Sequence, residues 1–178
     1  MTRKVALLRA VNVGGRKLPM AALRDLCEEL GWSDVATYIQ SGNVLFSEAG
    51  KAEANESALE RAIDKKFGIE VPVIVRTAAQ WTRLAAGNPF PDAARDEPNR
   101  IHLLLSKRPP RSDAAEGLSE RARAGETVRA VRDALWIHYP AGAGTSKITP
   151  ALIDRACGSP ATGRNFRTVL KLQEMLAE

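Results

Sequence analysis

The sequence predicts an α+β protein built as a tandem of two ferredoxin-like halves, each in the split βαβ order β-α-β-β-α-β, with extra helices. Three observations support this fold class. An apolar run at residues 5–11 is typical of a strand buried on both faces. Two β-rich runs meet at a short Gly/Asn turn, residues 41–43, as in a hairpin. Most of the same element order then recurs after residue 100.

The first half is delimited by residues that start or stop helices. Its expected elements are strand 5–11, a helix from Pro19 to Gly31, hairpin strands 35–40 and 44–47, a helix from Asn55 to Gly68, and strand 71–75. Proline fits a first helical turn, and glycine ends a helix in the left-handed conformation. Pro72 cannot donate to a sheet ladder, so the last strand should lie at an edge. Thr77 and Gln80 then form a capping box that opens an additional helix.

The second half follows a segment, residues 87–99, that is rich in proline and acid and lacks periodicity. We interpret this segment as a linker between domains 1–87 and 98–178. The expected elements after it are strand 101–105, helix 112–123, hairpin strands 127–131 and 135–139, a helix capped by Thr149 that ends at Gly158, and a last helix over roughly 164–176. This last helix stands where the plan expects a fourth strand.

Composition favours a cytoplasmic protein. The two cysteines, Cys27 and Cys157, are too few for a disulfide framework and lack metal-ligand spacing. The opening apolar run is far shorter than the roughly 20 residues of a membrane helix, and it lacks the features of a secretory signal. The 26 basic and 21 acidic side chains give a net charge of +5. This excess permits nucleic acid or a phosphorylated small molecule as a partner and requires neither.

Several long motifs resemble the signatures of one family. They are residues 5–15, residues 37–44, residues 88–90, Ser146-Lys147, and residues 164–172. Together they span nearly the whole chain in order, and the chain is identified as a member of the domain-of-unknown-function family numbered 1697. The resemblance implies an α/β bacterial-type protein with ferredoxin-like halves. It implies no established activity.

The first candidate binding site is the strand-to-helix loop at residues 12–17, which has adjacent glycines and two basic residues. Free amides in front of a helix can hold phosphate, although a tight turn with positive φ explains the same glycines. In a ferredoxin-like half this loop and the hairpin turn lie at one end of the sheet, so they should be neighbours. The residues expected to bind a ligand here are Asn12, Gly14, Gly15, Arg16, Lys17, Ser41, Gly42 and Asn43.

Two further candidates lie in the second half. The loop at residues 142–147 lacks the order of a phosphate-binding P-loop, which leaves Lys147 as part of a looser anion cradle or of an ordinary loop. In the predicted last helix, Arg164, Arg167 and Lys171 share one face at i, i+3 and i+7. With Asn165, this face is either a docking surface for phosphate or an acidic partner, or a solvated basic surface.

No catalytic or metal-binding pattern stands out. His102 and His138 lie in predicted strands without cysteine or glutamate at ligand spacing. Phe46 is the one aromatic residue of the central strands that could stack an RNA base. The leading hypothesis is a non-catalytic binding protein for a phosphorylated small molecule or nucleotide. Weak nonspecific nucleic-acid binding, a protein-interaction edge near Pro72 and an enzyme of unfamiliar type stay open; the sequence names no cofactor.

Overall fold

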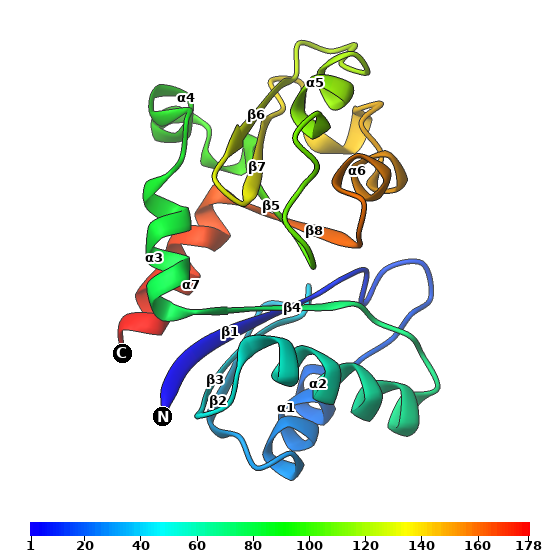
Figure 1. The fold of residues 1–178 in the computed structure, drawn as a ribbon, viewed down its shortest axis with the longest axis vertical. Helices are drawn as coiled ribbons and strands as arrows, with labels where there is room; N and C mark the ends of the chain where they lie inside the picture. Colours follow the sequence, from blue (N-terminus) through cyan, green and yellow to red (C-terminus); the bar gives the residue numbers. More distant parts are fainter. The chain divides into compact units, whose positions relative to one another are not determined.

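The computed structural model describes residues 1–178 and shows an α+β protein with two four-stranded antiparallel sheets (Figure 1). The chain divides into two compact units. The first unit is Met1–Thr82 with Leu172–Glu178, and the second is Arg83–Lys171. The C-terminal residues, which the sequence assigned to the second half, therefore cluster with the first unit. None of the helices combines the length and the apolar character that a membrane span needs.

The first unit follows the element order expected from the sequence. Its elements are β1 (Thr2–Leu8), α1 (Met20–Glu29), β2 (Ser33–Tyr38), β3 (Asn43–Glu48), α2 (Ala52–Phe67), β4 (Val73–Thr77) and the start of α3 (Ala78–Ala86). The sheet has the order β2-β3-β1-β4, so β4 lies at an edge, as Pro72 predicted. Gly68, at φ 65°, ends α2 as expected. Thr77 and Gln80 form both hydrogen bonds of the predicted capping box, at 3.2 and 2.9 Å.

The core of this unit lies between α1, α2 and one face of the sheet. Helix α1 contributes Leu23 and Cys27, and α2 contributes Leu59 and Ile63. At its centre Trp32 stacks on Phe46, with ring centroids 3.9 Å apart. The largest deviations from the predicted strands are at their ends. Strand β1 stops at Leu8 and β2 at Tyr38, because the residues that follow turn into positive φ.

The second unit repeats the sheet order, as β6-β7-β5-β8. Its elements are the end of α3, α4 (Pro91–Asp96), η1 (Pro98–Arg100), β5 (Ile101–Ser106), α5 (Ala114–Ser119), β6 (Thr127–Val131), β7 (Ala134–His138), η2 (Ala143–Thr145), α6 (Pro150–Cys157), β8 (Ala161–Asn165) and the start of α7 (Phe166–Ala177). The Thr149 hydroxyl caps α6 by accepting from the Leu152 amide, as predicted. The segment predicted as a linker, residues 87–99, holds α4 and most of η1.

The main correction to the predicted fold is strand β8. The sequence placed Arg164 and Asn165 in the last helix, but both belong to this strand, and α7 begins at Phe166. Its residues, Ala161 to Asn165, lack apolar alternation, so no periodic signal marks them. Pairing with β5 makes the strand: Ser106 lies opposite Ala161, and Leu103 lies opposite Arg164. The fourth strand that seemed to be missing is therefore present.

Candidate functional site

A surface pocket of about 390 Å³ lies at the predicted loop 12–17. Its lining residues are Asn12, Gly15, Arg16, Lys17 and Gln40. Four of them come from the loop before α1, and Gln40 comes from the turn between β2 and β3. Two segments distant in sequence therefore meet at this end of the first unit. Gln40 was not among the predicted residues; its position directly before the Ser41 turn was the available signal.

The side chain of Asn12 fastens the two segments together. Its Oδ1 accepts a 2.9 Å hydrogen bond from the Leu18 amide, and its Nδ2 donates to the carbonyl oxygens of Leu18 at 3.0 Å and Gln40 at 2.7 Å. Asn12 has a φ of 56°, which asparagine tolerates better than most residues. The polar atoms of its side chain are therefore engaged by the protein, so Asn12 shapes the rim of the pocket.

The hairpin turn at residues 41–43 packs against the end of β1. A Cβ atom on Gly42 would lie 2.6 Å from Cγ2 of Val11 and 2.8 Å from Cβ of Leu8. Asn43 is fully buried, and its Nδ2 donates to the Tyr38 carbonyl oxygen at 2.9 Å and to Ser41 Oγ at 3.1 Å. Gly42 and Asn43 therefore hold the turn in place and offer little surface to a ligand. Ser41 is exposed.

The rim of the pocket carries hydrogen-bond donors and positive charge. Gly14 and Gly15 have φ values of 58° and 84°, and their amides donate to no acceptor within the protein; Gly15 lines the pocket, and Gly14 precedes it in the loop. Lys17 is exposed and forms no ion pair, while Nη2 of Arg16 donates to the Glu70 carbonyl oxygen at 3.0 Å. No carboxylate lines the pocket. This combination of free amides and cations suits an anion.

The loop around Lys147, in the second unit, has a carboxylate at its base. Ser146 Oγ donates a 2.5 Å hydrogen bond to Glu126, which also accepts from the amides of Arg123 and Ala124 at 3.0 and 2.8 Å. These bonds, that of Ser146 foremost, lower the pKa of Glu126 to about 2. Lys147 is exposed. The fixed negative charge next to it works against an anion cradle here.

The basic face predicted for the last helix is wrong at Arg164. This residue is 7% exposed on β8, where its Nη1 donates to Thr162 Oγ1 at 2.7 Å and to the Gly163 carbonyl oxygen at 2.8 Å. Burial lowers the pKa of its guanidinium to about 10. Asn165 accepts a 2.9 Å bond from the Thr168 amide and so caps α7, and Lys171 is half-buried. These three residues therefore form no common exposed surface.

The thiol of Cys27 is buried in the first unit, and the His102 imidazole is partly buried in the second. Burial raises the pKa of Cys27 to about 12 and lowers that of His102 below its ordinary value. His102 stacks edge-on against Tyr139, with ring centroids 5.0 Å apart. No group of three or more His, Cys, Asp or Glu side chains gathers as a metal site would require.

Comparisons with known proteins bear on family and fold. Residues 1–136 match the model of a family described as "Protein of unknown function (DUF1697)". No curated protein sequence matches the chain. Among solved structures, the conserved bacterial protein SP0830 from Streptococcus pneumoniae is similar, with a TM-score of 0.74 at 21% sequence identity over 98% of each chain. At this identity the likeness shows the fold alone.

Proposed function

The chain belongs to the DUF1697 family of proteins of unknown function, and we propose that it is a non-catalytic binding protein for a phosphorylated small molecule or nucleotide. The site is the pocket of loop 12–17. A single observation carries the proposal: the amides of Gly14 and Gly15 lack a protein acceptor beside the free ammonium group of Lys17. Backbone amides and a lysine are the donors that phosphate sites commonly combine.

The size and stability of the pocket support a small-molecule ligand. Its volume of about 390 Å³ falls within the range of roughly 300–1,000 Å³ typical of ligand sites. The loop is closed by two backbone bonds, from the Asn12 amide to the Arg16 carbonyl oxygen at 2.6 Å and from the Arg16 amide to the Val13 carbonyl oxygen at 3.1 Å. The backbone amides of the loop are therefore held in place before a ligand arrives, which reduces the entropic cost of binding.

The strand order supports a finer fold assignment. We propose that each half is ferredoxin-like, within domains 1–87 and 98–178. The order β2-β3-β1-β4 with antiparallel neighbours is the one expected when each βαβ crossover is split by an inserted strand. The second sheet, β6-β7-β5-β8, has the same order.

Nucleic-acid binding has less support as a function. Phe46, the one predicted stacking residue, is fully buried and stacks on Trp32, so it cannot receive a base. Nonspecific binding to the phosphate backbone of a nucleic acid would rest on the positive net charge of the protein alone. Calorimetric titration with a single-stranded oligonucleotide at low salt, alongside the small-molecule test below, measures this alternative directly.

The test is isothermal titration calorimetry with matched pairs of ligands, AMP against adenosine and ribose 5-phosphate against ribose. We expect the phosphorylated member of a pair to bind and its parent to bind far more weakly. Lys17→Ala should weaken binding at least tenfold, since a hydrogen bond to a charged group contributes about 1.5–3 kcal/mol. Lys65→Ala, an exposed lysine on α2, is the matched control and should leave the affinity unchanged. Equal affinities in the two variants, or no binding of any phosphorylated ligand, would refute the proposal.

A further inference from the structure

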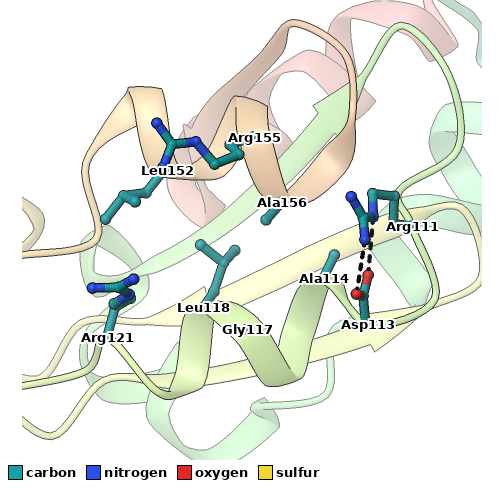
Figure 2. Close-up of a pocket in the computed structure, with 9 residues that line it drawn as sticks. All are labelled: Arg111, Asp113, Ala114, Gly117, Leu118, Arg121, Leu152, Arg155 and Ala156. Atoms are coloured by element: carbon teal, nitrogen blue, oxygen red, sulfur yellow. Dashed lines mark hydrogen bonds and ion pairs between the residues drawn. The ribbon is translucent and has the colours of Figure 1, made fainter.

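A second pocket, of about 200 Å³, lies within the second unit between α5 and α6 (Figure 2). Its floor is apolar. Ala114 and Leu118 of α5 are each 1% exposed and belong to the core of this unit. Leu152 and Ala156 of α6 pack partly buried against the same core. The floor is therefore fixed by the core packing and does not depend on surface side chains.

Three arginines line the pocket around this floor: Arg111, Arg121 and Arg155. Arg111 is already neutralised, because its Nε and Nη2 donate to the two carboxylate oxygens of Asp113 at 3.1 and 3.0 Å. This pair lowers the pKa of Asp113 below its ordinary value, chiefly through the hydrogen bond from Arg111. The guanidinium groups of Arg121 and Arg155 have neither a hydrogen bond nor an ion pair within the protein, and both residues are exposed. The pocket therefore carries two uncompensated positive charges.

Figure 2 shows where these charges lie. Arg155 comes from α6, Arg121 comes from the turn after α5, and in this view both stand on the side of the pocket away from the Arg111–Asp113 pair. The apolar side chain of Leu152 lies between the two guanidinium groups in the same view, and Leu118 lies beside it. A guest that reaches both guanidinium groups would thus also contact the apolar floor.

Gly117 is a third feature of the pocket lining. It lies inside α5, where glycine is less favourable than alanine. Its φ is not positive, and a Cβ atom added to it would meet nothing within 4 Å. Neither the backbone nor the packing of the protein requires glycine here. The missing side chain leaves one wall of the pocket open.

We propose that this pocket binds a small organic anion with a short apolar chain, such as an alkyl phosphate or an alkyl carboxylate. Arg121 and Arg155 hold the anionic group, because a guanidinium presents paired donors that match phosphate and carboxylate oxygens. The alkyl chain lies on Leu118 and Leu152. The volume of about 200 Å³ is smaller than the usual range for drug-sized ligands, roughly 300–1,000 Å³, which restricts the chain to a few carbons. This site is independent of the pocket at loop 12–17.

The test is calorimetric titration of the whole chain at low salt with four probes: n-butyl phosphate, butyrate, inorganic phosphate and n-butanol. We expect n-butyl phosphate or butyrate to bind at one site per chain with at least tenfold higher affinity than inorganic phosphate or n-butanol. The comparison of n-butyl phosphate with butyrate decides which anionic group is preferred. Binding should also shift the Nε–Hε signals of Arg121 and Arg155 in NMR spectra.

Variants locate the binding. Arg121→Gln with Arg155→Gln should weaken the preferred probe at least tenfold, and Gly117→Leu should do the same by filling the pocket. The matched control is Arg61→Gln, an exposed arginine on α2, which should leave the affinity unchanged. All four residues are exposed, so melting temperatures should confirm that each variant folds. The proposal is overturned if no organic anion binds, if the affinity is the same in the double variant, or if Lys17→Ala alone abolishes binding. This last result would assign the anion to loop 12–17.

Discussion

The ammonium group of Lys4 donates a 2.7 Å hydrogen bond to Oδ1 of Asn55 and so joins β1 to α2 inside the first unit. Lys4 is 1% exposed. Its other hydrogen bonds go to the Glu48 carboxylate at 3.0 Å and to the Gly50 carbonyl oxygen at 2.5 Å. A lysine ammonium has three donors, and all three are used here. Hydrogen bonds from Asn55 and then Lys4 also lower the pKa of Glu48 below its ordinary value.

Replacing this lysine should be costly. We expect Lys4→Met to lower the free energy of unfolding by about 2–3 kcal/mol, because the Glu48 carboxylate and the Asn55 amide lose their cationic partner next to the core. Urea denaturation followed by circular dichroism measures the change. Lys65→Met, at an exposed position on α2, should change stability by less than about 0.5 kcal/mol. Similar losses in the two variants would show that the buried network is not stabilising.

The contact between the hairpin turn and β1 can be tested at Gly42. We expect Gly42→Ala to destabilise the protein by about 3 kcal/mol, since it combines a left-handed backbone with a clash against Leu8 and Val11. Gly68→Ala is the matched control: its φ is also positive, at 65°, but nothing lies within 4 Å of the added Cβ. Gly68→Ala should lower the free energy of unfolding by only about 1–2 kcal/mol. If thermal and urea denaturation give equal losses for the two variants, the turn does not pack on β1.

The hydrogen bonds to Glu126 should make stability depend on pH. Its pKa in the folded state is lowered from 4.5 to about 2, so its contribution is fully present above pH 4.5 and is lost as the pH falls toward 2. We expect Glu126→Gln to destabilise the protein most near neutral pH, and the difference from the parent to shrink in acid. Urea denaturation at a series of pH values measures this. The control is Glu116→Gln, on the exposed face of α5. Its difference from the parent in the free energy of unfolding should not change with pH. A difference for Glu126→Gln that also stays constant with pH would contradict the prediction.

The capping box at the start of α3 should have a measurable effect. Thr77→Ala removes the hydroxyl that accepts from the Gln80 amide, and we expect a loss of about 1 kcal/mol, as for other N-cap residues. Ser57→Ala is a suitable comparison, since the Ser57 hydroxyl only donates back to the Glu53 carbonyl oxygen within α2. That change should be neutral or slightly stabilising. Chemical denaturation distinguishes the two; a neutral Thr77→Ala would show that the cap does not contribute.

Local signals predicted most of the fold. The apolar run of β1, the glycines that end α2 and α6, and the caps at Thr77 and Thr149 each act within a few residues, so their effect can be read from neighbouring positions. Strand β8 could not be predicted in this way. It has little apolar character of its own, and its backbone is held by hydrogen bonds to β5, more than fifty residues away in the chain.

The roles of polar residues depended on the tertiary structure. Asn12 and Asn43 lie in turns that resemble ligand-binding loops, but their side chains bond to the protein itself. Asn12 donates to the Gln40 carbonyl oxygen, 28 residues away, and Asn43 donates to the Tyr38 carbonyl oxygen and to Ser41 Oγ. The sequence around Lys4 does not distinguish it from a surface lysine. Its buried role follows only from its contacts with Glu48 and Asn55, which lie far away in the chain. Arg121 and Arg155 line one pocket only because α5 packs on α6. Backbone preferences follow from nearby residues, whereas a hydrogen bond or a pocket requires side chains that folding alone brings together.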